Sequence, residues 1–355
     1  MKFSDVLDIR NGRNQRQVEN ANGKYPIYGS GGAMGHATDF ICDAGTVVIG
    51  RKGSINNPIF VDEPFWNVDT AFGLVAHRDV LLPKYLFYFC VNFDFEQLNT
   101  TVTIPSLTKA NLLQIEINVP DMDEQRHVVS VLDKICRLTD LQQQELHSLD
   151  QLVKSRFIEL FGEPQRNPHG YKHIKLSDIA TYYNGLTYKP ENVAAEGTIV
   201  LRSSNIQNSQ LDFADTVRVD CAIKERLMVQ NNDILMCSRN GSAKLVGKVA
   251  LIKDIQEPMS FGAFMMIIRS HYFGYLMTYF QMDAFRQQIK TGATTTINQI
   301  TGRMLDDVTI PLPPMALVDK FAAFVEQTDK SKLAVQKGLQ ELEILKKSLM
   351  QQYFG

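Results

Sequence analysis

The sequence predicts an α+β fold in which two tandem, mixed and strand-rich domains are separated by two long helices that form an antiparallel coiled coil. Three observations lead to this prediction. The 355-residue chain contains an internal repeat, each copy ends in a long stretch without proline, and short apolar runs rich in β-branched residues precede those stretches. Two copies of one unit in one chain also predict an internal pseudo-two-fold axis.

The repeat is seen at two spacings. Near the start of each copy, residues 3–6 (FSDV) match residues 176–179 (LSDI), 173 positions apart. Later the spacing is 193, as between Leu112 and Leu305, and it holds to the Phe-Gly pairs at 161–162 and 354–355. The change in spacing places about twenty additional residues in the variable middle of the second copy.

The globular part of each copy is expected to contain more strand than helix. Short apolar runs bounded by turn residues are typical of strands, and longer aromatic-rich runs are typical of helices. The expected strands are 46–50, 115–119, 234–238 and 248–252, and one helix is expected in each of 82–98 and 273–289.

The stretches that follow Pro120 and Pro313 predict the long helices. Each runs for about forty residues without proline, and at ~1.5 Å per residue each helix would be roughly 55–60 Å long. Apolar residues recur at alternating steps of four and three, a coiled-coil seam interrupted by Thr139, Gln142, Lys332 and Lys346. An amphipathic helix packed on its own domain is the alternative. The expected segments are domain 1 (1–121), helix 1 (122–162), domain 2 (163–314) and helix 2 (315–355).

Composition excludes several classes of protein. No apolar run is long enough for a membrane span, and the N-terminus has no apolar leader, so we expect a cytoplasmic protein without a membrane partner. The five cysteines are scattered and form no CxxC pair, so no metal site is expected. The net charge is −2, with 10 Lys and Arg against 13 Asp and Glu in residues 1–121. A surface for nucleic acid would therefore be a local patch.

Two fragments resemble parts of a methyltransferase. Residues 29–32 (GSGG) resemble a nucleotide-approach turn, and residues 57–60 (NPIF) resemble the Asn-Pro-Pro-aromatic motif with Ile59 in place of proline. The fragments lie too close together for the βαβ units that such a fold requires, and neither recurs in the second copy. No catalytic residue is expected, and a stand-alone methyltransferase or nuclease is kept as an alternative.

Two other motifs do recur. Residues 51–54 (RKGS) and 239–242 (RNGS) each follow a short apolar strand, and threonine-rich runs at 100–103 and 294–296 come later in each copy. Arginine and lysine can serve phosphates or guanine, asparagine can serve adenine, and hydroxyl groups suit phosphate contacts. Solvated turns and a β-prone run are the alternative interpretation.

With these residues in view, the chain resembles the specificity (S) subunits of type I restriction-modification systems. The resemblance is carried by residues 25–32 (YPIYGSGG), 46–54 (TVVIGRKGS), 66–72 (WNVDTAF) and 117–120 with 124–126 (INVP, EQR). It continues in residues 310–314 (IPLPP) and in the Phe-Gly pairs that end each helix. After residues 310–314, Val318 and Asp319 replace the Glu-Gln pair that is usual in the family.

The resemblance implies a non-catalytic subunit that reads a bipartite, asymmetric site in double-stranded DNA. It further implies two adenine-methyltransferase subunits and two motor-nuclease restriction subunits as partners. This chain would hold no cofactor, while S-adenosylmethionine, ATP and Mg would be bound by the partner subunits. Helix length would set the gap between the two half-sites. A structural pseudo-dimer that joins proteins without touching DNA is a further alternative.

The candidate site residues lie in the segments just described. The residues predicted to contact DNA are Lys24, Tyr28, Ser30, Arg51, Lys52, Ser54, Thr101, Thr103, Arg202, Ser204, Asn205, Arg239, Asn240, Ser242, Lys244, Thr295, Thr296 and Asn298. The residues predicted to bind partners lie on the helices and are Leu132, Ile135, Leu149, Val325, Leu339 and Leu342.

Overall fold

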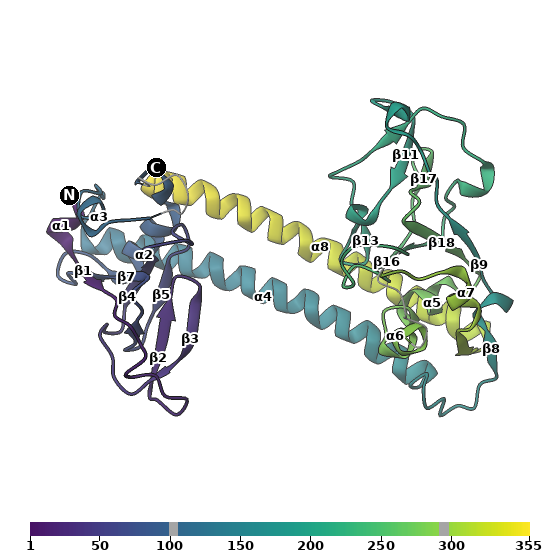
Figure 1. The fold of residues 1–355 in the computed structure, drawn as a ribbon, viewed down its shortest axis with the longest axis horizontal. Coiled ribbons are helices and arrows are strands. Elements are labelled where there is room, and N and C mark those ends of the chain that lie inside the picture. The colour runs from purple at the N-terminus through teal and green to yellow at the C-terminus, as the bar shows by residue number, and fades with distance from the viewer. Residues whose placement is uncertain (99–105, 291–297) are drawn as a thin grey trace. The chain divides into compact units, whose positions relative to one another are not determined.

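The computed structural model describes residues 1–98, 106–290 and 298–355. The chain divides into two compact units. Unit 1 contains residues 1–145 and 335–355, and unit 2 contains residues 146–334. Each of the two longest helices contributes one part of its length to each unit, and Figure 1 labels them α4 and α8.

Unit 1 is built on two small sheets. The first has the strand order β1-β7-β4-β5 with antiparallel neighbours, and the second has the order β3-β2-β6, in which β2 and β6 are parallel. The elements are α1 (Phe3–Val6), β1 (Leu7–Asn11), β2 (Tyr25–Gly29), β3 (Gly32–Ala37), β4 (Thr46–Gly50), β5 (Ile59–Val61), β6 (Trp66–Asn67), β7 (Ala71–Ala76), α2 (Pro83–Asn92), the 3-10 helix η1 (Phe95–Leu98) and α3 (Lys109–Leu112).

The core of unit 1 lies between the first sheet and the helices. All five residues of β4 are buried, as its run of β-branched residues predicts for a central strand. The core also takes in Val128 and Leu132 from α4 and Met350 from α8. The ring of Phe354 lies 5.1 Å from that of Tyr85, centroid to centroid, so the last turn of α8 is packed against α2.

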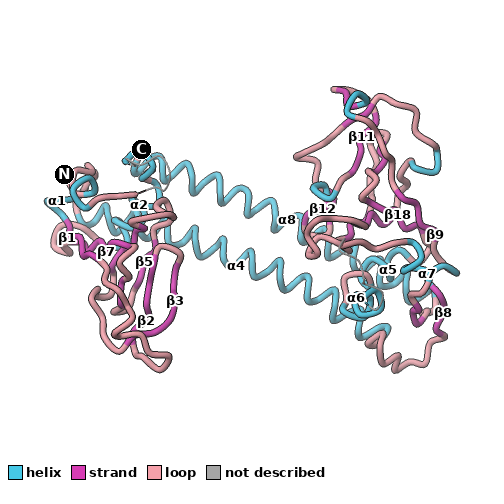
Figure 2. Tube along the Cα trace, viewed as in Figure 1, coloured by secondary structure: helices cyan, strands magenta, loops and turns pink. Residues whose placement is uncertain are grey.

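Unit 2 contains more strands than unit 1, and Figure 2 shows that long loops connect them. Its elements are β8 (His173–Lys175), η2 (Leu176–Asp178), β9 (Thr181–Asn184), η3 (Pro190–Asn192), β10 (Val193–Ala194), β11 (Thr198–Leu201), η4 (Ser203–Asn205), β12 (Ile206–Gln207), β13 (Gln210–Leu211), β14 (Arg218–Val219), η5 (Glu225–Leu227), β15 (Ile234–Cys237), β16 (Val249–Leu251), β17 (Met259–Phe261), β18 (Met265–Arg269), α5 (Phe273–Tyr279), α6 (Asp283–Lys290), α7 (Gly302–Asp306) and β19 (Thr309–Pro311).

The sheets of the two units have the same strand order. Unit 2 has the order β9-β18-β15-β16, which matches β1-β7-β4-β5 strand by strand in chain order. In the second sheet β11 and β17 are parallel, as β2 and β6 are in unit 1. The hairpin β12-β13 and the strand β10 are additional in unit 2, in the variable middle where the change in repeat spacing predicts extra residues.

The long helices are α4 (Met122–Phe161) and α8 (Met315–Phe354), close to the predicted bounds. They are antiparallel, because the start of α4 joins the end of α8 in unit 1 and the reverse holds in unit 2. Asp121 caps α4, since its Oδ1 accepts from the backbone N–H of Glu124 at 2.9 Å. The predicted α+β fold with two strand-rich parts and two long helices is therefore confirmed.

The seam between the helices varies in burial along its length. Leu132 and Phe157 are fully buried, whereas Leu146 and Leu149 are half-buried. In unit 2 the seam residue Lys332 donates to Asp150 of the other helix at 2.6 Å, and its side chain is only 15% exposed. Lys332, one of the predicted polar interruptions, thus lies in the seam itself.

Three local predictions are wrong. The helix expected over 273–289 is two helices, α5 and α6, with a break that lets Phe280 and Phe285 both turn inward. In a continuous helix, residues five positions apart would point about 140° apart. The helix expected over 82–98 stops at Asn92 and continues as η1. Residues 115–119 form only one isolated bridge, between Glu116 and Lys2.

No helix in the described ranges is long and apolar enough to cross a membrane.

Candidate nucleic-acid interface

The first recurring motif forms an exposed loop at the end of β4 in unit 1. The backbone N–H of Arg51 donates to Thr70 O at 2.8 Å, and Arg51 O accepts from Leu107 N at 3.0 Å. Gly53 has φ +81°, a conformation that favours glycine, so it allows the loop to turn tightly. The side chains of Arg51, Lys52 and Ser54 are exposed. The loop therefore presents two cations and a hydroxyl group on a fixed backbone.

The hairpin between β2 and β3 lies beside this loop. A Cβ atom at Gly50 would come within 2.9 Å of Ser30 Cβ and 2.2 Å of Ser54 O, so the absence of a side chain at Gly50 brings these segments together. Lys24 is exposed but precedes β2, at the strand's opposite end from Ser30. Tyr28 packs edge-on against Phe65. The structure thus joins Ser30 to the Arg51 loop and leaves Lys24 apart from it.

The glycines of this hairpin have no role like that of a nucleotide-binding turn. Residues 29–32 connect two antiparallel strands, whereas such a turn leads from a strand into a helix. The fragment at 57–60 runs into the edge strand β5. The structure therefore gives neither fragment the surroundings that methyl transfer requires.

The second recurring motif forms the corresponding loop in unit 2. Arg239, Ser242 and Lys244 are exposed after β15. The backbone N–H of Asn240 donates to Asn298 O at 3.3 Å, and Asn298 Nδ2 donates to Gly241 O at 3.2 Å. The residues just after the threonine-rich run are therefore attached to this loop.

The same attachment occurs in both units. Lys52 forms an isolated bridge with Ser106, and Arg239 forms one with Gln299. Each loop thus pairs with the segment that follows the threonine-rich run of its own copy. Each loop and the segment after the run thus meet in space, although they lie about fifty to sixty residues apart along the chain. The predicted threonines, Thr101, Thr103, Thr295 and Thr296, lie outside the described residues.

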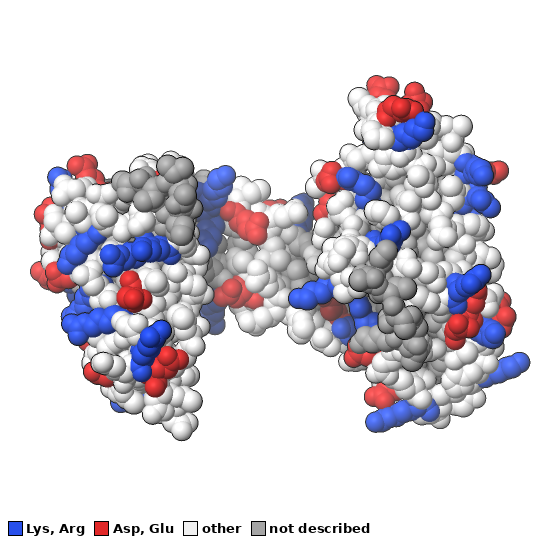
Figure 3. Space-filling model, in the orientation of Figure 1, with Lys and Arg blue, Asp and Glu red and all other residues white. Residues whose placement is uncertain are grey.

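The basic side chains of these loops are available to a ligand. Within the described ranges, Arg51, Lys52, Arg239 and Lys244 form no ion pair within 4.0 Å. Burial raises the pKa of the Cys237 thiol, so this neighbour stays neutral and the loop keeps a net positive charge. Figure 3 shows that acidic side chains are interspersed among the basic ones on the face in view, so any positive patch is local.

Two predicted residues of unit 2 have structural partners. Asn205 is buried, accepts from the backbone N–H of Arg202 at 2.8 Å and donates to the carbonyls of Asp212 and Asp215 at 2.8 Å. The prediction that Asn205 contacts DNA is therefore corrected: its side chain shapes the turn that exposes Ser204. Asn240 is partly used as well, since its Oδ1 accepts from Ser242 N at 2.9 Å.

Arg202 and Phe264, an aromatic residue that no sequence motif singles out, line a recess of about 380 Å³ in unit 2. Phe264 lies on the turn between β17 and β18 with its side chain 59% exposed, and the Arg239 guanidinium lies 5.5 Å from its ring centroid. Arg202 pairs with Asp215 at 2.7 Å. Sequence alone gave no signal for Phe264, because exposure of a turn residue depends on the neighbouring loops.

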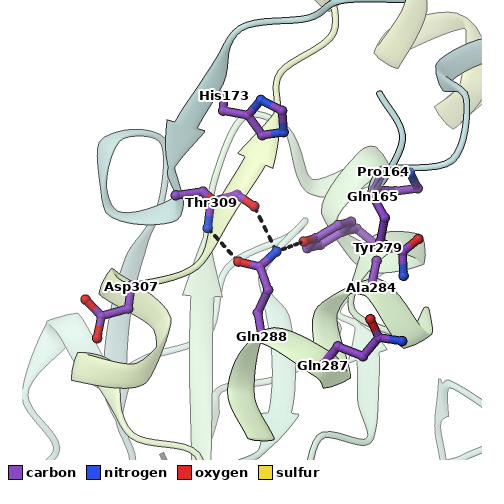
Figure 4. Close-up of a pocket in the computed structure, with 9 residues that line it drawn as sticks. All are labelled: Pro164, Gln165, His173, Tyr279, Ala284, Gln287, Gln288, Asp307 and Thr309. Atoms are coloured by element: carbon purple, nitrogen blue, oxygen red, sulfur yellow. Dashed lines mark hydrogen bonds between the residues drawn. The ribbon is translucent and has the colours of Figure 1, made fainter. Parts of the chain in front are cut away.

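A second recess of unit 2, of about 420 Å³, is lined by polar groups that hold helix α6 in place (Figure 4). Gln288 Nε2 donates to the hydroxyl of Tyr279 at 2.7 Å and to Thr309 O at 2.9 Å. The backbone N–H of Thr309 donates back to Gln288 Oε1 at 2.9 Å. These contacts join α6 to β19, a structural role.

Comparison with known proteins identifies the family. The family model described as "Type I restriction modification DNA specificity domain" matches residues 1–151 and 168–344, most of the chain and both copies of the repeat. The chain belongs to this family. The family resemblance predicted from the sequence is thereby confirmed.

The chain is also similar to curated specificity subunits of type I restriction enzymes. The chain is 29% identical over 178 residues to the type I restriction enzyme EcoKI specificity subunit of Escherichia coli, covering 46% of this chain and 38% of that protein. It is 28% identical over 196 residues to the StySPI specificity subunit of Salmonella potsdam, covering 52% and 42%. These matches span less than half of each relative's length.

Two further matches span more of the chain. The MjaVIII specificity subunit of Methanocaldococcus jannaschii is 22% identical over 335 residues, which cover 87% of this chain and 75% of that protein. The crystal structure of the type I system S subunit from M. genitalium matches with a TM-score of 0.63 at 16% identity, covering 100% and 95%. At this identity the structural match shows the fold.

In this member of the specificity family, the predicted partner-binding residues lie along the helix seam. Leu132 and Ile135 are buried in unit 1, and Leu149, Val325, Leu339 and Leu342 are half-buried. Other apolar residues on the helices are exposed: Leu138, Leu141, Ile344 and Leu345 in unit 1, and Leu152 and Leu333 in unit 2. That partners bind at the six seam residues stays a prediction, and the exposed leucines are more accessible to another protein.

Proposed function

We propose that this chain is the non-catalytic specificity subunit of a type I restriction-modification complex and reads a bipartite, asymmetric site in double-stranded DNA. One observation carries the proposal. In each unit, a loop that carries an arginine without an ion-pair partner among the described residues is attached to the segment after the threonine-rich run. Such a loop offers a guanidinium group, which suits guanine edges and phosphates.

The differences between the loops support an asymmetric site. Lys52 follows Arg51 in unit 1, whereas Asn240 follows Arg239 in unit 2. Phe264 adds an exposed ring to the second loop alone. Because base edges are distinguished by donor, acceptor and methyl positions, unlike side chains should select unlike bases. Two such readers in one chain favour two different half-sites.

Docking of other subunits belongs to the same proposal. We expect two adenine-methyltransferase subunits and two motor-nuclease subunits, with S-adenosylmethionine, ATP and Mg bound by those partners. The exposed leucines on α4 and α8 support docking, because apolar helix faces in contact with water are commonly covered by another protein. The small number of basic residues also fits partners that share in neutralising phosphates, so the isolated chain should bind DNA weakly.

The test is to co-express the chain with its cognate methyltransferase subunit and map methylated adenines across a genome. A motif split by a fixed gap supports the proposal. Methylation without a motif, or no complex between the two proteins, contradicts it.

Two controls separate the alternatives. A stand-alone methyltransferase would transfer methyl groups from S-adenosylmethionine without a partner, so the isolated chain is assayed in parallel and is expected to be inactive. A scaffold that never contacts DNA would tolerate neutral residues at Arg51, Lys52 and Arg239, whereas a DNA reader would lose its motif.

A further inference from the structure

Phe264 occupies a position that differs between the two units. The strand register pairs Cys237 with Met265 in unit 2 and Ile49 with Phe72 in unit 1. Aligning Arg239 with Arg51 also matches these two residue pairs. The next pair toward the loop then places Phe264 of unit 2 at the position of Ala71 in unit 1, and Ala71 is buried. Arg51 lies over Phe72, a buried ring, whereas Arg239 lies over the exposed ring of Phe264. Unit 2 thus adds an aromatic surface at its arginine loop.

The backbone holds Phe264 in place. Its carbonyl oxygen accepts three hydrogen bonds, from Ser238 N at 3.0 Å, Arg239 N at 3.1 Å and Ser238 Oγ at 3.0 Å. The turn closes with Met265 N donating to Gly262 O at 2.8 Å. An exposed phenyl ring on a fixed turn loses little conformational freedom when it meets a ligand. The packing of unit 2 gives no reason for an aromatic ring at this exposed position.

The surroundings of the ring combine an apolar wall with donors. The lining of the recess that Phe264 shares includes the apolar residues Leu186, Ala263 and Met265 and the polar residues Arg202 and two serines. Arg202 Nε is buried and has no hydrogen-bond partner in the described part of the chain. A ligand with a small apolar group next to a hydrogen-bond acceptor matches this arrangement.

We propose that Phe264 reads a thymine in the half-site of unit 2, through contact with the C5-methyl group, while the adjacent O4 accepts a hydrogen bond from Arg239. In the major groove only thymine presents a methyl group beside an acceptor, and phenyl rings are among the side chains that contact it. This inference rests on the proposed function and names one base of the site.

The experiment uses the chain assembled with its methyltransferase subunit and duplexes that carry the mapped motif. Each thymine of the motif is replaced in turn by deoxyuridine, which lacks the methyl group and keeps O4. Initial rates of methyl transfer are measured at subsaturating DNA. With the unaltered chain, one position should show a loss of about fourfold, the effect expected for one methyl group removed from water.

Variants then assign that loss to Phe264. In Phe264→Ala, thymine and deoxyuridine at that position should give equal rates, both near the rate of the unaltered chain with deoxyuridine. Phe264→Leu keeps an apolar side chain and should retain part of the preference. Phe213→Ala, which removes another exposed ring of unit 2 outside the recess, should behave as the unaltered chain.

Two results would overturn the inference: a full preference for thymine in Phe264→Ala, or no sensitivity to deoxyuridine at any thymine of the motif. A half-site of unit 2 with no A·T pair would overturn it as well. Failure of the proposed function looks different, because no split motif would then be found before any deoxyuridine is introduced.

Discussion

Units 1 and 2 share a framework and differ in what it presents. Both have a four-stranded sheet of the same order, and both attach an arginine loop to the segment after the threonine-rich run. Unit 1 surrounds its loop with a glycine-rich hairpin and keeps Phe72 buried. Unit 2 surrounds its loop with the turn at Phe264 and the 203–205 turn. The comparison teaches that the framework fixes where the candidate loops lie, and the side chains on the loops determine which ligand groups they can contact.

The largest expected effect concerns a buried ion pair of unit 2 that has no counterpart at the corresponding positions of unit 1. Arg269 donates to both carboxylate oxygens of Asp233 at 2.7 Å, and this hydrogen bonding raises the pKa of the guanidinium. The corresponding positions of unit 1 are Gly45 and Ala76. Asp233→Ala leaves a largely buried cation unpaired and should destabilise unit 2 by about 3–5 kcal/mol.

Hydrogen exchange resolves that effect by unit. Amides of β15 and β18 should exchange faster in Asp233→Ala, while those of β4 and β7 keep their protection. Asp220→Ala, at an exposed position of unit 2, is the matched control and should change little. Equal loss of protection in both units would show that they do not unfold separately.

The next effect tests whether each loop serves its own half-site. Arg51→Ala and Arg239→Ala should each lower the rate of methyl transfer on the cognate duplex about 10- to 100-fold, because each removes a charged donor pair from a base or phosphate. Arg226→Ala removes an exposed arginine that lies outside the loops and should change the rate less than about twofold. A normal rate in either loop variant would remove that loop from the interface.

A smaller effect compares the helix seams. In unit 2 the seam has the Lys332–Asp150 pair, whereas in unit 1 Gly338 lies against the amide end of Gln142. Gly338→Ala should stabilise unit 1 by about 0.5–1 kcal/mol through helix propensity, because the flexible Gln142 side chain can move aside. Chemical denaturation measures the gain in the free energy of unfolding. The double variant Gln142→Ala/Gly338→Ala should retain this gain. A loss of stability in Gly338→Ala that the double variant does not show would mean that the Gln142 side chain is held rigidly.

The smallest effect depends on pH and concerns an exposed pair in unit 2. Arg218 donates to Glu257 at 2.6 Å, and this hydrogen bond holds the pKa of Glu257 below its usual value of 4.5. A lowered pKa means that the stabilisation is present above pH 4.5 and is lost as pH falls through the folded-state value. Glu257→Gln should therefore lower the thermal midpoint slightly at pH 7 and by less at pH 3. Equal shifts at both pH values would exclude the ion pair as the cause.

Much of the fold could be predicted because it depends on repetition and periodicity. The two long helices were found within a residue of their ends, since proline marks their starts and apolar steps of four and three mark their seam. The break between α5 and α6 was missed, because it serves the burial of Phe280 and Phe285 and leaves no proline or glycine in the sequence.

The candidate site was predicted in part. Recurrence found the arginine loops, because both copies keep the same four-residue motif in the same place. It did not distinguish Asn205, whose side chain is consumed by a turn, from exposed Ser204 beside it. Phe264 was missed for the related reason that exposure depends on how distant loops pack. Local sequence therefore predicts where a candidate interface lies and does not rank the residues within it.

The central claim is that two separate readers lie in one chain. The most direct test maps methylated adenines in genomes that express the complex with Arg51→Ala or with Arg239→Ala, beside the unaltered complex. The account predicts that each substitution relaxes the motif in one half only, a different half for each, with the gap unchanged. Relaxation of both halves by either substitution, or of the same half by both, would contradict it.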